Sequence, residues 1–423
     1  MPAHSEEKSV THLHCIGAAC GATFDLHTPL MACPKCGELL EVVVDTPNAD
    51  AAALKLLWSE RRRSFAEIDA SGVWRFREAL PQYAAEHVVT LREGNVPMVR
   101  AQRAAEFAGV THLHFKHLGW NPTGCFKDLG MTTGMTEARY LGAKVVACAS
   151  TGNTAASLAA YAARAGVVGR VYLPAGQVSM NKLAQALDFG AEIVEVNGSF
   201  DDALNTLLAL PPEEVYFLNS VNPFRIEGQK TCMYEVMEER GWRAPDYLVV
   251  PGGNLGNSAS FGKAFDELLR WGLIERAPKM IVVQAAGANP FARLWRERAK
   301  NPDAVLQPLD PETRATAIRI GNPRSWRKAL HGVESTGGRV IDVTDEEIGE
   351  AKAAIGRDGI GCEPASATTL AGLKKLREAG VVERDAEVVA MLTGHGLKDT
   401  AYILEQHGAG GPNGANQGQQ EGH

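Results

Sequence analysis

The stretch KVVACASTGNTAASLAAYAARAGVVGRVYLPAG, residues 144–176, determines the fold class that the sequence predicts. Residues 144–150 and 170–176 are apolar runs of strand length, and residues 153–166 between them form an alanine-rich segment of helix length. A strand, a helix and a second strand in this order are typical of a βαβ unit, whose two strands lie parallel in one sheet. The stretch therefore predicts an α/β fold.

The same alternation continues on both sides of this unit. Further strands are predicted at 112–118, 191–196 and 279–287 and at the starts of 246–269 and 387–399. Further helices are predicted at 131–142 and 181–190, at the end of 246–269 and within 339–355. In 339–355, Thr344 is the expected helix N-cap, and Glu347 three residues later completes a capping box.

The length and the hydrophobic content predict two lobes plus an appendage, with parallel sheets covered by helices. The expected units are a zinc-ribbon-like module at 1–45, a large lobe at 46–122 and 219–407, a small lobe at 123–218 and a tail at 408–423. The tail is rich in Gly, Asn and Gln and is expected to be disordered, because it offers nothing to bury.

The composition excludes several classes of protein. The chain has 423 residues, 45% of them hydrophobic, and a formal net charge of -7 with acids and bases evenly mixed. No basic face favours nucleic acid. The first residues do not resemble a secretory signal, and no apolar run is long enough to cross a bilayer. We therefore expect a cytoplasmic protein that binds neither nucleic acid nor membrane.

Four of the eight cysteines lie within the first 36 residues. Cys15 and Cys20 form one pair and Cys33 and Cys36 a second, and each pair spans a tight turn. Four thiolates in two turns, followed by a strand of alternating polarity, predict a structural zinc ribbon. The alternative is a degenerate ribbon with four thiols and no metal.

Three junctions follow predicted strands and lead toward helices or turns. They are STGNTAAS at 150–157, PGGNLGN at 251–257 and LTGHGLKD at 392–399. In an open α/β sheet, ligands bind at such junctions, where backbone amides are free. PGGNLGN suits a phosphate, but it lacks both the GxGxxG spacing and the Walker lysine, which favours a group smaller than a nucleotide. Alone, it also fits an ordinary glycine turn.

The stretch NPTGCFKDLG, residues 121–130, adds a lysine to this picture. Lys127 follows a Pro and Gly turn and an aromatic residue. A lone lysine in such a place is commonly a solvated surface charge. A small phosphate cradle together with a lysine in a turn, however, is what pyridoxal phosphate requires, because this cofactor is held by its phosphate and by a lysine Schiff base.

These motifs together resemble those of the threonine synthases, which are pyridoxal-phosphate enzymes of the tryptophan-synthase-β fold type, also called fold type II. Three further stretches match the family: NSVNPFRIEGQKT at 219–231, AIRIGNPRSW at 317–326 and EPASATTLAGL at 363–373. The resemblance covers residues 90 to 400, roughly, and the N-terminal ribbon also resembles one found in many members.

The resemblance implies a role for each matching residue. Lys127 is the implied Schiff-base lysine and the catalytic residue, with Phe126 beside the ring. Asn153 matches the partner of the cofactor's 3′-oxygen, and Thr393 the partner of its pyridine nitrogen. The implied phosphate loop is Gly252, Gly253, Asn254, Leu255, Gly256 and Asn257. The implied substrate-binding residues are Asn219, Ser220, Arg225 and Lys230 at the substrate phosphate, and Ser150, Thr151 and Thr154 at its carboxylate.

The implied reaction is that of a carbon-oxygen lyase that converts O-phospho-L-homoserine and water into L-threonine and phosphate. The family's usual state is a homodimer. Cys125 and Leu129 depart from the residues of many members, without removing a group that the chemistry needs. The alternatives are a related enzyme acting on another phosphorylated amino acid, as in cysteate synthase, a hydroxyamino-acid dehydratase, and a non-catalytic zinc-ribbon binding protein.

Overall fold

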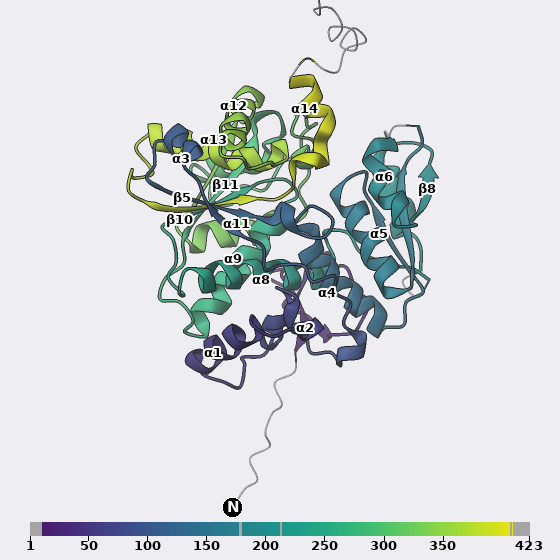
Figure 1. Ribbon diagram of the computed structural model, residues 1–423. Helices are drawn as coiled ribbons and strands as arrows, with labels where there is room; N and C mark the ends of the chain where they lie inside the picture. Colours follow the sequence, from purple (N-terminus) through teal and green to yellow (C-terminus); the bar gives the residue numbers. More distant parts are fainter. Residues whose placement is uncertain (1–10, 177–179, 212–213, 407, 409–423) are drawn as a thin grey trace, which may run out of the picture.

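The computed structural model describes residues 11–176, 180–211, 214–406 and 408 (Figure 1). The tail that was predicted to be disordered lies outside these ranges except for Gly408. Among the described residues, no helix combines the length and the apolar character that a membrane span requires.

The larger of two parallel sheets has six strands in the order β12-β11-β10-β13-β5-β4. Five of its strands run parallel, and β4 pairs antiparallel with β5. The strands are β4 (Met98–Arg100), β5 (His112–His117), β10 (Tyr247–Pro251), β11 (Lys279–Ala285), β12 (Arg339–Val343) and β13 (Glu387–Leu392). This arrangement and the smaller sheet confirm the predicted α/β class.

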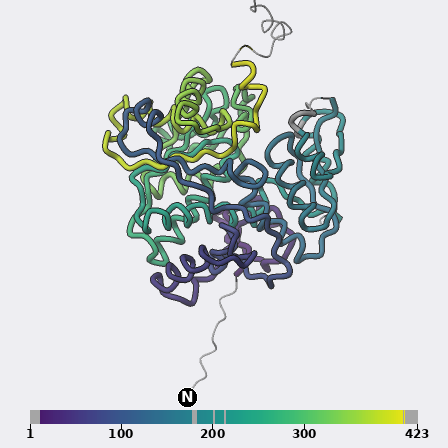
Figure 2. The backbone as a smooth tube through the Cα atoms, in the orientation of Figure 1, coloured from purple at the N-terminus to yellow at the C-terminus, as the bar shows by residue number. Residues whose placement is uncertain are grey.

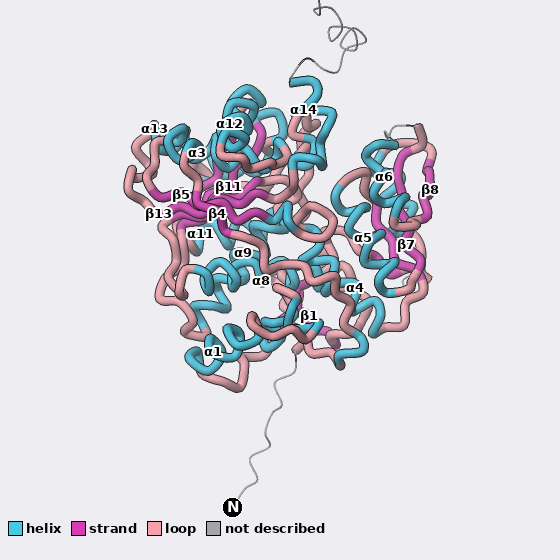
Figure 3. The backbone as a smooth tube through the Cα atoms, viewed as in Figure 1, coloured by secondary structure: helices cyan, strands magenta, loops and turns pink. Residues whose placement is uncertain are grey.

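Helices cover both faces of the larger sheet (Figure 3). One face carries α3 (Arg103–Ala108), α12 (Asp345–Arg357) and α13 (Pro364–Glu378), and the other carries α8 (Pro223–Glu239), α9 (Gly256–Arg270), α10 (Pro290–Arg298) and α11 (Trp326–Ser335). Side chains alternate between the two cores along each strand. In β10, Leu248 and Val250 pack into one core, and Tyr247 and Val249 into the other.

The smaller sheet has four parallel strands in the order β8-β7-β6-β9. Its strands are β6 (Val145–Ala149), β7 (Val168–Pro174), β8 (Glu192–Val196) and β9 (Tyr216–Phe217), and its helices include α5 (Asn153–Ala165), α6 (Met180–Asp188) and α7 (Phe200–Leu208). The predicted βαβ unit is confirmed, because β6 and β7 pair in parallel on either side of α5. Figure 2 shows the chain entering this teal part once and then returning to the larger sheet.

The first strands form a separate three-stranded antiparallel sheet, which we call the ribbon. Its order is β2-β1-β3, with β1 (His12–Cys15), β2 (Thr23–Asp25) and β3 (Leu40–Val43). The core of the ribbon includes Phe224 of α8, so the ribbon and the catalytic part of the chain share a hydrophobic cluster. The remaining α-helices are α1 (Ala51–Arg61), α2 (Glu67–Ala70), α4 (Lys127–Tyr140) and α14 (Thr400–Gln406).

Helices α4 and α8 approach each other closely because glycines lie at their contact. A Cβ atom on Gly228 would lie 1.8 Å from the carbonyl oxygen of Leu129, and one on Gly130 would lie 2.6 Å from that of Arg225. A side chain at either position would force the two backbones apart. This contact sets the distance between the N-terminal ends of the two helices, where Lys127 and Arg225 lie.

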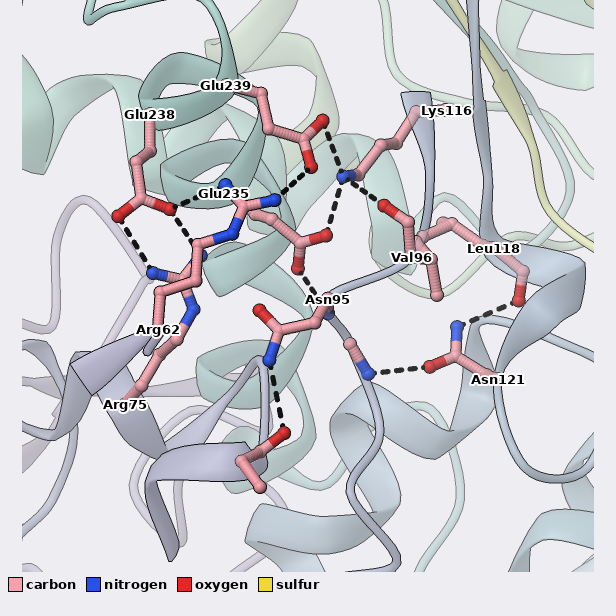
Figure 4. A network of polar contacts seen from close by, with 12 residues as sticks. Arg62, Arg75, Asn95, Val96, Lys116, Leu118, Asn121, Glu235, Glu238 and Glu239 are labelled. Carbon is pink, nitrogen blue, oxygen red and sulfur yellow. Dashed lines mark hydrogen bonds and ion pairs between the residues drawn. The ribbon is translucent and has the colours of Figure 1, made fainter. Parts of the chain in front are cut away.

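A buried ionic network fixes the other end of α8 (Figure 4). Lys116 of β5 forms ion pairs with Glu235 at 2.5 Å and Glu239 at 3.1 Å, and Arg75 pairs with Glu238 at 2.6 Å. Burying such charges costs desolvation energy that their attraction only partly repays. The network therefore contributes mainly to the orientation of α8 relative to the sheet.

Local predictions were confirmed at some positions and wrong at others. The Thr344 and Glu347 capping box at the start of α12 is present. The predicted helix at 131–142 begins four residues earlier, at Lys127, so the lysine lies in the first turn of α4. Helix α8 was not predicted as a helix.

Candidate active site

Two turns that are distant in the sequence meet beside Lys127. The amide of Phe126 donates to the carbonyl of Thr393 at 2.9 Å, and the amide of His395 donates to that of Gly124 at 2.9 Å. An isolated β-bridge between Cys125 and Gly394 lies between these two bonds. The structure thereby brings together the stretches NPTGCFKDLG and LTGHGLKD.

The ammonium group of Lys127 lies over the ring of Phe126, 4.0 Å from the ring centroid. Burial, and after it the positive charge of Arg225, lower the pKa of Lys127 to about 8. Both causes disfavour the charged form. A substantial fraction of this amine is therefore neutral near physiological pH and can act as a nucleophile or a base.

Asp128, the next residue, holds the turn in place. Its carboxylate accepts hydrogen bonds from the Thr123 amide at 2.7 Å, the Thr123 hydroxyl at 2.7 Å and the Ser157 hydroxyl at 2.6 Å. It is fully buried, and burial raises the pKa of Asp128 to about 6. The sequence analysis assigned Asp128 no role, although it lies beside the lysine.

We expect Asp128→Asn to lower the free energy of unfolding by about 2 kcal/mol, because an amide NH₂ would replace the oxygen that accepts from both the Thr123 and the Ser157 hydroxyls, while the amide oxygen still accepts from the Thr123 amide. Ser157→Ala removes only one donor and is the matched control, with an expected loss of about 1 kcal/mol. Urea unfolding of the two variants measures the difference. Equal losses would contradict this account of Asp128.

The glycine loop PGGNLGN lies between β10 and α9. Leu255 has a φ of +64° at the N-cap of α9, and the helix begins at Gly256. The first amides of a helix have no intrahelical acceptor, so this loop offers donors and the positive end of a helix dipole. A Cβ atom on Gly252 would lie 2.8 Å from a methyl carbon of Val282, which explains glycine at that position.

The side chain of Asn254 connects the loop to two other segments. Its amide nitrogen donates to the hydroxyl of Ser220, and its oxygen accepts from the backbone amide of Arg324 at 2.7 Å. The stretches at 219–231 and 317–326 therefore contact the loop directly. Asn219 in turn bonds the amide and the carbonyl of Ala149 at 2.9 and 3.0 Å, at the end of β6.

Glu363 links Asn153 and Thr393, which come from different sheets. Asn153 Nδ2 donates to one carboxylate oxygen at 3.0 Å and Thr393 Oγ1 donates to the other at 3.1 Å. Burial raises the pKa of Glu363. The sequence analysis quoted the stretch that contains Glu363 but gave this residue no role. The only signal was its place immediately before Pro364, at the start of α13.

Arg225 is a buried cation without a carboxylate partner among the described residues. One guanidinium nitrogen donates to the carbonyl of Leu218 at 3.1 Å, and Nε has no partner. Burial lowers the pKa of Arg225 to about 10, so the group stays charged at neutral pH. A buried charge with an unused donor is costly unless an anion binds there. The side chain thus provides a site for a phosphate or carboxylate near Lys127.

The remaining residues that the sequence singled out have different surroundings. Ser150, Thr151 and Thr154 lie where β6 meets α5, and the hydroxyl of Ser150 accepts from the Gly152 amide at 3.2 Å. Among the described residues, no hydrogen bond or ion pair joins Lys230 to this cluster. Its ammonium pairs with Glu227 at 2.6 Å and Glu267 at 2.8 Å, so its charge is already matched.

Comparison with known proteins gives the family. Residues 89–394 match the model of the pyridoxal-phosphate dependent enzyme family. Threonine synthase of Methanocaldococcus jannaschii is 47% identical over 382 residues, which cover 90% of this chain and 91% of that protein. Threonine synthase of Methanosarcina acetivorans is 43% identical and covers 93% of this chain and 94% of that protein. The chain belongs to the threonine synthase family.

Solved structures show that this chain shares its fold with other pyridoxal-phosphate enzymes. The processed form of threonine deaminase isoform 2 from Solanum lycopersicum superposes with a TM-score of 0.64 at 20% identity, covering 89% of this chain and 98% of that one. Serine racemase from maize gives a TM-score of 0.60 at 19% identity, covering 74% of this chain and 94% of that one. These likenesses place the fold in the fold type II class.

The residues around Lys127 fit the cofactor of the family. The partly neutral amine of Lys127 could form a Schiff base with an aldehyde, and the amides at the start of α9 could hold a phosphate. Asn153 and Thr393, which donate to Glu363 in this structure, could contact the ring oxygen and the ring nitrogen. In threonine synthases the cofactor is pyridoxal phosphate. The donor set of this chain is compatible with it.

The four N-terminal cysteines converge in the ribbon of this threonine synthase family member. Their sulfur atoms lie within 4.8 Å of one another, with Cys15 and Cys36 at 3.3 Å and Cys20 and Cys33 at 3.7 Å. A zinc tetrahedron with sulfur at about 2.3 Å requires sulfur separations of about 3.8 Å. The cluster therefore has the composition and nearly the dimensions of a Cys₄ zinc site.

Proposed function

We propose that the chain converts O-phospho-L-homoserine and water into L-threonine and phosphate, with pyridoxal phosphate carried by Lys127. The observation that carries this proposal is the pair formed by Lys127 and Arg225. Lys127 is an amine with a pKa of about 8. Arg225 is a buried guanidinium that has no carboxylate partner in the described part of the chain, and its charge acts on that amine. A lysine for the amino-acid end and an arginine for a phosphate suit a phosphorylated amino acid.

The proposed cofactor seat uses the residues described above. The amides from Gly253 to Asn257 hold the cofactor phosphate, Asn153 contacts the ring oxygen and Thr393 contacts the ring nitrogen. When bound, pyridoxal phosphate supplies an electron-withdrawing ring that stabilises negative charge on an attached amino acid. Because a threonine hydroxyl does not hold a proton on the ring nitrogen as a carboxylate would, this withdrawal is restrained.

The proposed substrate-binding residues form two groups, one on each side of Lys127. Ser150, Thr151 and Thr154 bind the carboxylate of the substrate at the end of β6. Arg225 binds its phosphate through charge-assisted hydrogen bonds, with Asn219 and Ser220 beside it. We leave Lys230 out of the proposed seat because both of its carboxylate partners are buried with it.

The proposed proton transfers belong to Lys127. Its free amine takes a proton from Cα, and a second proton then leaves Cβ, which allows the phosphate on Cγ to depart. The amine next delivers a proton to Cγ. Water then adds its hydroxyl at Cβ, and a proton returns to Cα to give L-threonine. Arg225 stabilises the charge that develops on the departing phosphate.

A paired assay of both products tests this function. We expect the holoenzyme to release phosphate and L-threonine in equal amounts from O-phospho-L-homoserine. Phosphate without threonine would refute the proposal, and so would activity with O-phospho-L-serine alone, which would favour the cysteate-synthase-like alternative. A purified protein that stays colourless with added cofactor would favour a binding protein without catalysis.

We also propose that the cysteine cluster binds one structural zinc ion. Burial opposes it, but the backbone amides of Lys35 and Cys36 lower the pKa of Cys33 to about 7. Burial raises the pKa of Cys15 to about 12, so metal binding must displace the proton of that thiol. The thiolate is the form that binds metal. In this view the metal closes the ribbon, which is too small to bury a sufficient core alone.

We expect Cys33→Ser to reduce the zinc content from about one ion per chain to nearly none and to lower the midpoint of thermal unfolding. Cys148→Ala is the matched control, because Cys148 is buried in the small sheet far from the cluster in sequence and should leave zinc unchanged. Atomic emission spectroscopy measures the metal. Wild-type protein purified without chelators that contains no zinc would contradict the proposal.

A homodimer and a cytoplasmic location complete the proposed function. The family resemblance supports the dimer, and light scattering of the holoenzyme tests it. The eight cysteines of the chain form no disulfide among the described residues, which is consistent with a reducing compartment.

A further inference from the structure

A cavity of about 500 Å³ lies between the ribbon and the catalytic part of the chain. Its walls come from β1 and β3 of the ribbon and from helices α8, α9 and α11. None of the residues proposed to bind cofactor or substrate lines it. A volume of this size lies within the range of about 300–1,000 Å³ that small-molecule sites occupy.

The cavity exists because two lysines hold the ribbon against the helices at separate points. Lys263 of α9 donates to the carbonyl of Val42, and Lys328 of α11 donates to the carbonyl of Leu40 at 2.8 Å. These carbonyls belong to β3, which is an edge strand of the ribbon. The docking therefore uses backbone contacts and leaves the outward side chains of β3 free to line the cavity.

The side chains of β3 give the cavity one charged and one apolar wall. Leu40 and Val42 are buried in the ribbon core, and Glu41 and Val43 alternate to the other side; Glu41, Val42 and Val43 all line the cavity. Among the described residues, Glu41 forms no ion pair and no hydrogen bond through its carboxylate. Ile226 of α8 adds to the apolar lining.

Lys328 supplies the opposite charge. Among the described residues, its ammonium donates only to Leu40, which uses one of its three donors. No described carboxylate lies within 4.0 Å of it, although the charges of Glu41 and Glu227 act on it from farther away. Burial lowers the pKa of Lys328 to about 8. Lys263, by contrast, is already paired with Glu227. Lys328 and Glu41 thus both retain unused hydrogen-bonding capacity. Of the other charged residues in the lining, Asp266 pairs with His331 and Arg327 with Glu38, whereas Arg270 forms no ion pair among the described residues.

We infer that this cavity is a binding site for an α-amino acid with an aliphatic side chain, whose carboxylate pairs with Lys328 and whose ammonium group pairs with Glu41. A ligand with both charges satisfies both side chains at once. Its hydrocarbon part contacts Val43 and Ile226.

The cavity touches two elements that lead to the active site. Ile226 directly follows Arg225 on α8. Lys328 lies in the first turn of α11, and four residues before it the Arg324 amide holds Asn254 of the glycine loop. A bound amino acid therefore contacts the backbone segments that place the proposed phosphate ligands.

The test is a calorimetric titration of the full-length, cofactor-loaded protein with L-valine, L-leucine and L-isoleucine. Two probes match leucine except for one charged group: 4-methylpentanoate lacks the amine and 3-methylbutylamine lacks the carboxylate. We expect at least one of the three amino acids to bind and both analogues of leucine to bind at least about tenfold more weakly than leucine. An analogue that binds as tightly as leucine, or no binding by any of the three, would overturn the inference.

Three variants locate the binding. Lys328→Met and Glu41→Gln each remove one charge, and Val43→Phe fills the cavity without changing its charge. We expect each to weaken binding by about tenfold or more. Lys374→Met, on the surface of α13, is the matched control and should bind normally. Because Lys328 also holds the ribbon, the thermal midpoint of each variant is measured together with its affinity. If Lys328→Met does not keep the native fold, the affinity of Val43→Phe decides the test.

The absorbance of the bound cofactor distinguishes an amino acid bound in this cavity from one bound in the active site. Binding in the cavity is expected to persist when an unreactive phosphonate analogue of O-phospho-L-homoserine occupies the active site. Binding that is displaced by this analogue and unchanged in all three variants would place the amino acid at Lys127 and overturn the inference, without affecting the proposed function.

Discussion

Replacing Lys127 by alanine is expected to lower the turnover number by about 10⁴-fold and to abolish the visible absorbance of the lysine-bound cofactor. The reason is that one amine is assigned both the attachment and the proton transfers. Its neighbours remain in place, because Asp128 and the Phe126 to Thr393 bond hold the turn without using the lysine side chain. Steady-state kinetics and an absorbance spectrum of the purified variant measure the two losses.

The matched control for this substitution is Lys374→Ala. Lys374 pairs with Glu378 on the surface of α13, at 3.3 Å, and touches nothing in the proposed site. It should keep full activity and full colour. A Lys127→Ala variant that retains both the absorbance and more than a small fraction of the activity would refute the assignment of Lys127.

Replacing Arg225 by methionine is expected to reduce kcat/KM for O-phospho-L-homoserine by about 10²–10³-fold. The guanidinium is 1% exposed and has no carboxylate partner among the described residues, so it is already desolvated for an incoming phosphate. Removing an uncompensated buried charge relieves the free protein of a cost. The thermal midpoint is therefore expected to stay the same or rise while activity falls.

The pH profile distinguishes this role from a general loss of structure. Activity needs the neutral amine of Lys127, so it rises with pH through the pKa of about 8. Burial is the largest cause of the lowered pKa and remains in the variant, but the charge of Arg225 is removed. The rising limb is therefore expected to move to higher pH in Arg225→Met and to stay in place in Arg225→Lys, which keeps the charge. An unmoved limb in both variants would contradict the coupling.

The meeting of the two turns beside Lys127 could be anticipated only in part from the sequence. The strand and helix periodicity located the junctions, and parallel strands place such junctions at one edge of a sheet. The periodicity carried no information on the bond between Phe126 and Thr393, because that contact joins residues that are 267 positions apart. Only the family resemblance connected them.

Helix α8 escaped prediction for a physical reason. Every residue from Pro223 to Met237 is buried, so the segment has no alternation between a polar and an apolar face. Its charged residues are matched inside the protein, as in the pairing of Lys230 with Glu227 and Glu267. Amphipathic periodicity identifies helices at a surface, and it cannot identify one that is enclosed on all sides.

Glu363 shows a second limit of reading the sequence. A glutamate before a proline at a helix start is compatible with an ordinary N-cap position. Its two hydrogen bonds to Asn153 and Thr393 depend on how the two sheets are placed relative to each other. That placement is set by the close contact of α4 and α8, which neither periodicity nor composition reveals.

The contacts of Lys263 and Lys328 with β3 determine what happens when a protease cleaves the chain after the ribbon. The ribbon adheres to the helices through two lysine contacts to its edge strand and through Phe224, none of which depends on the peptide between Val44 and Asp50. A protease that cleaves this connecting segment therefore leaves two fragments that remain associated. Co-expressed as separate polypeptides, residues 1–45 and 46–423 are expected to assemble into an active complementation pair.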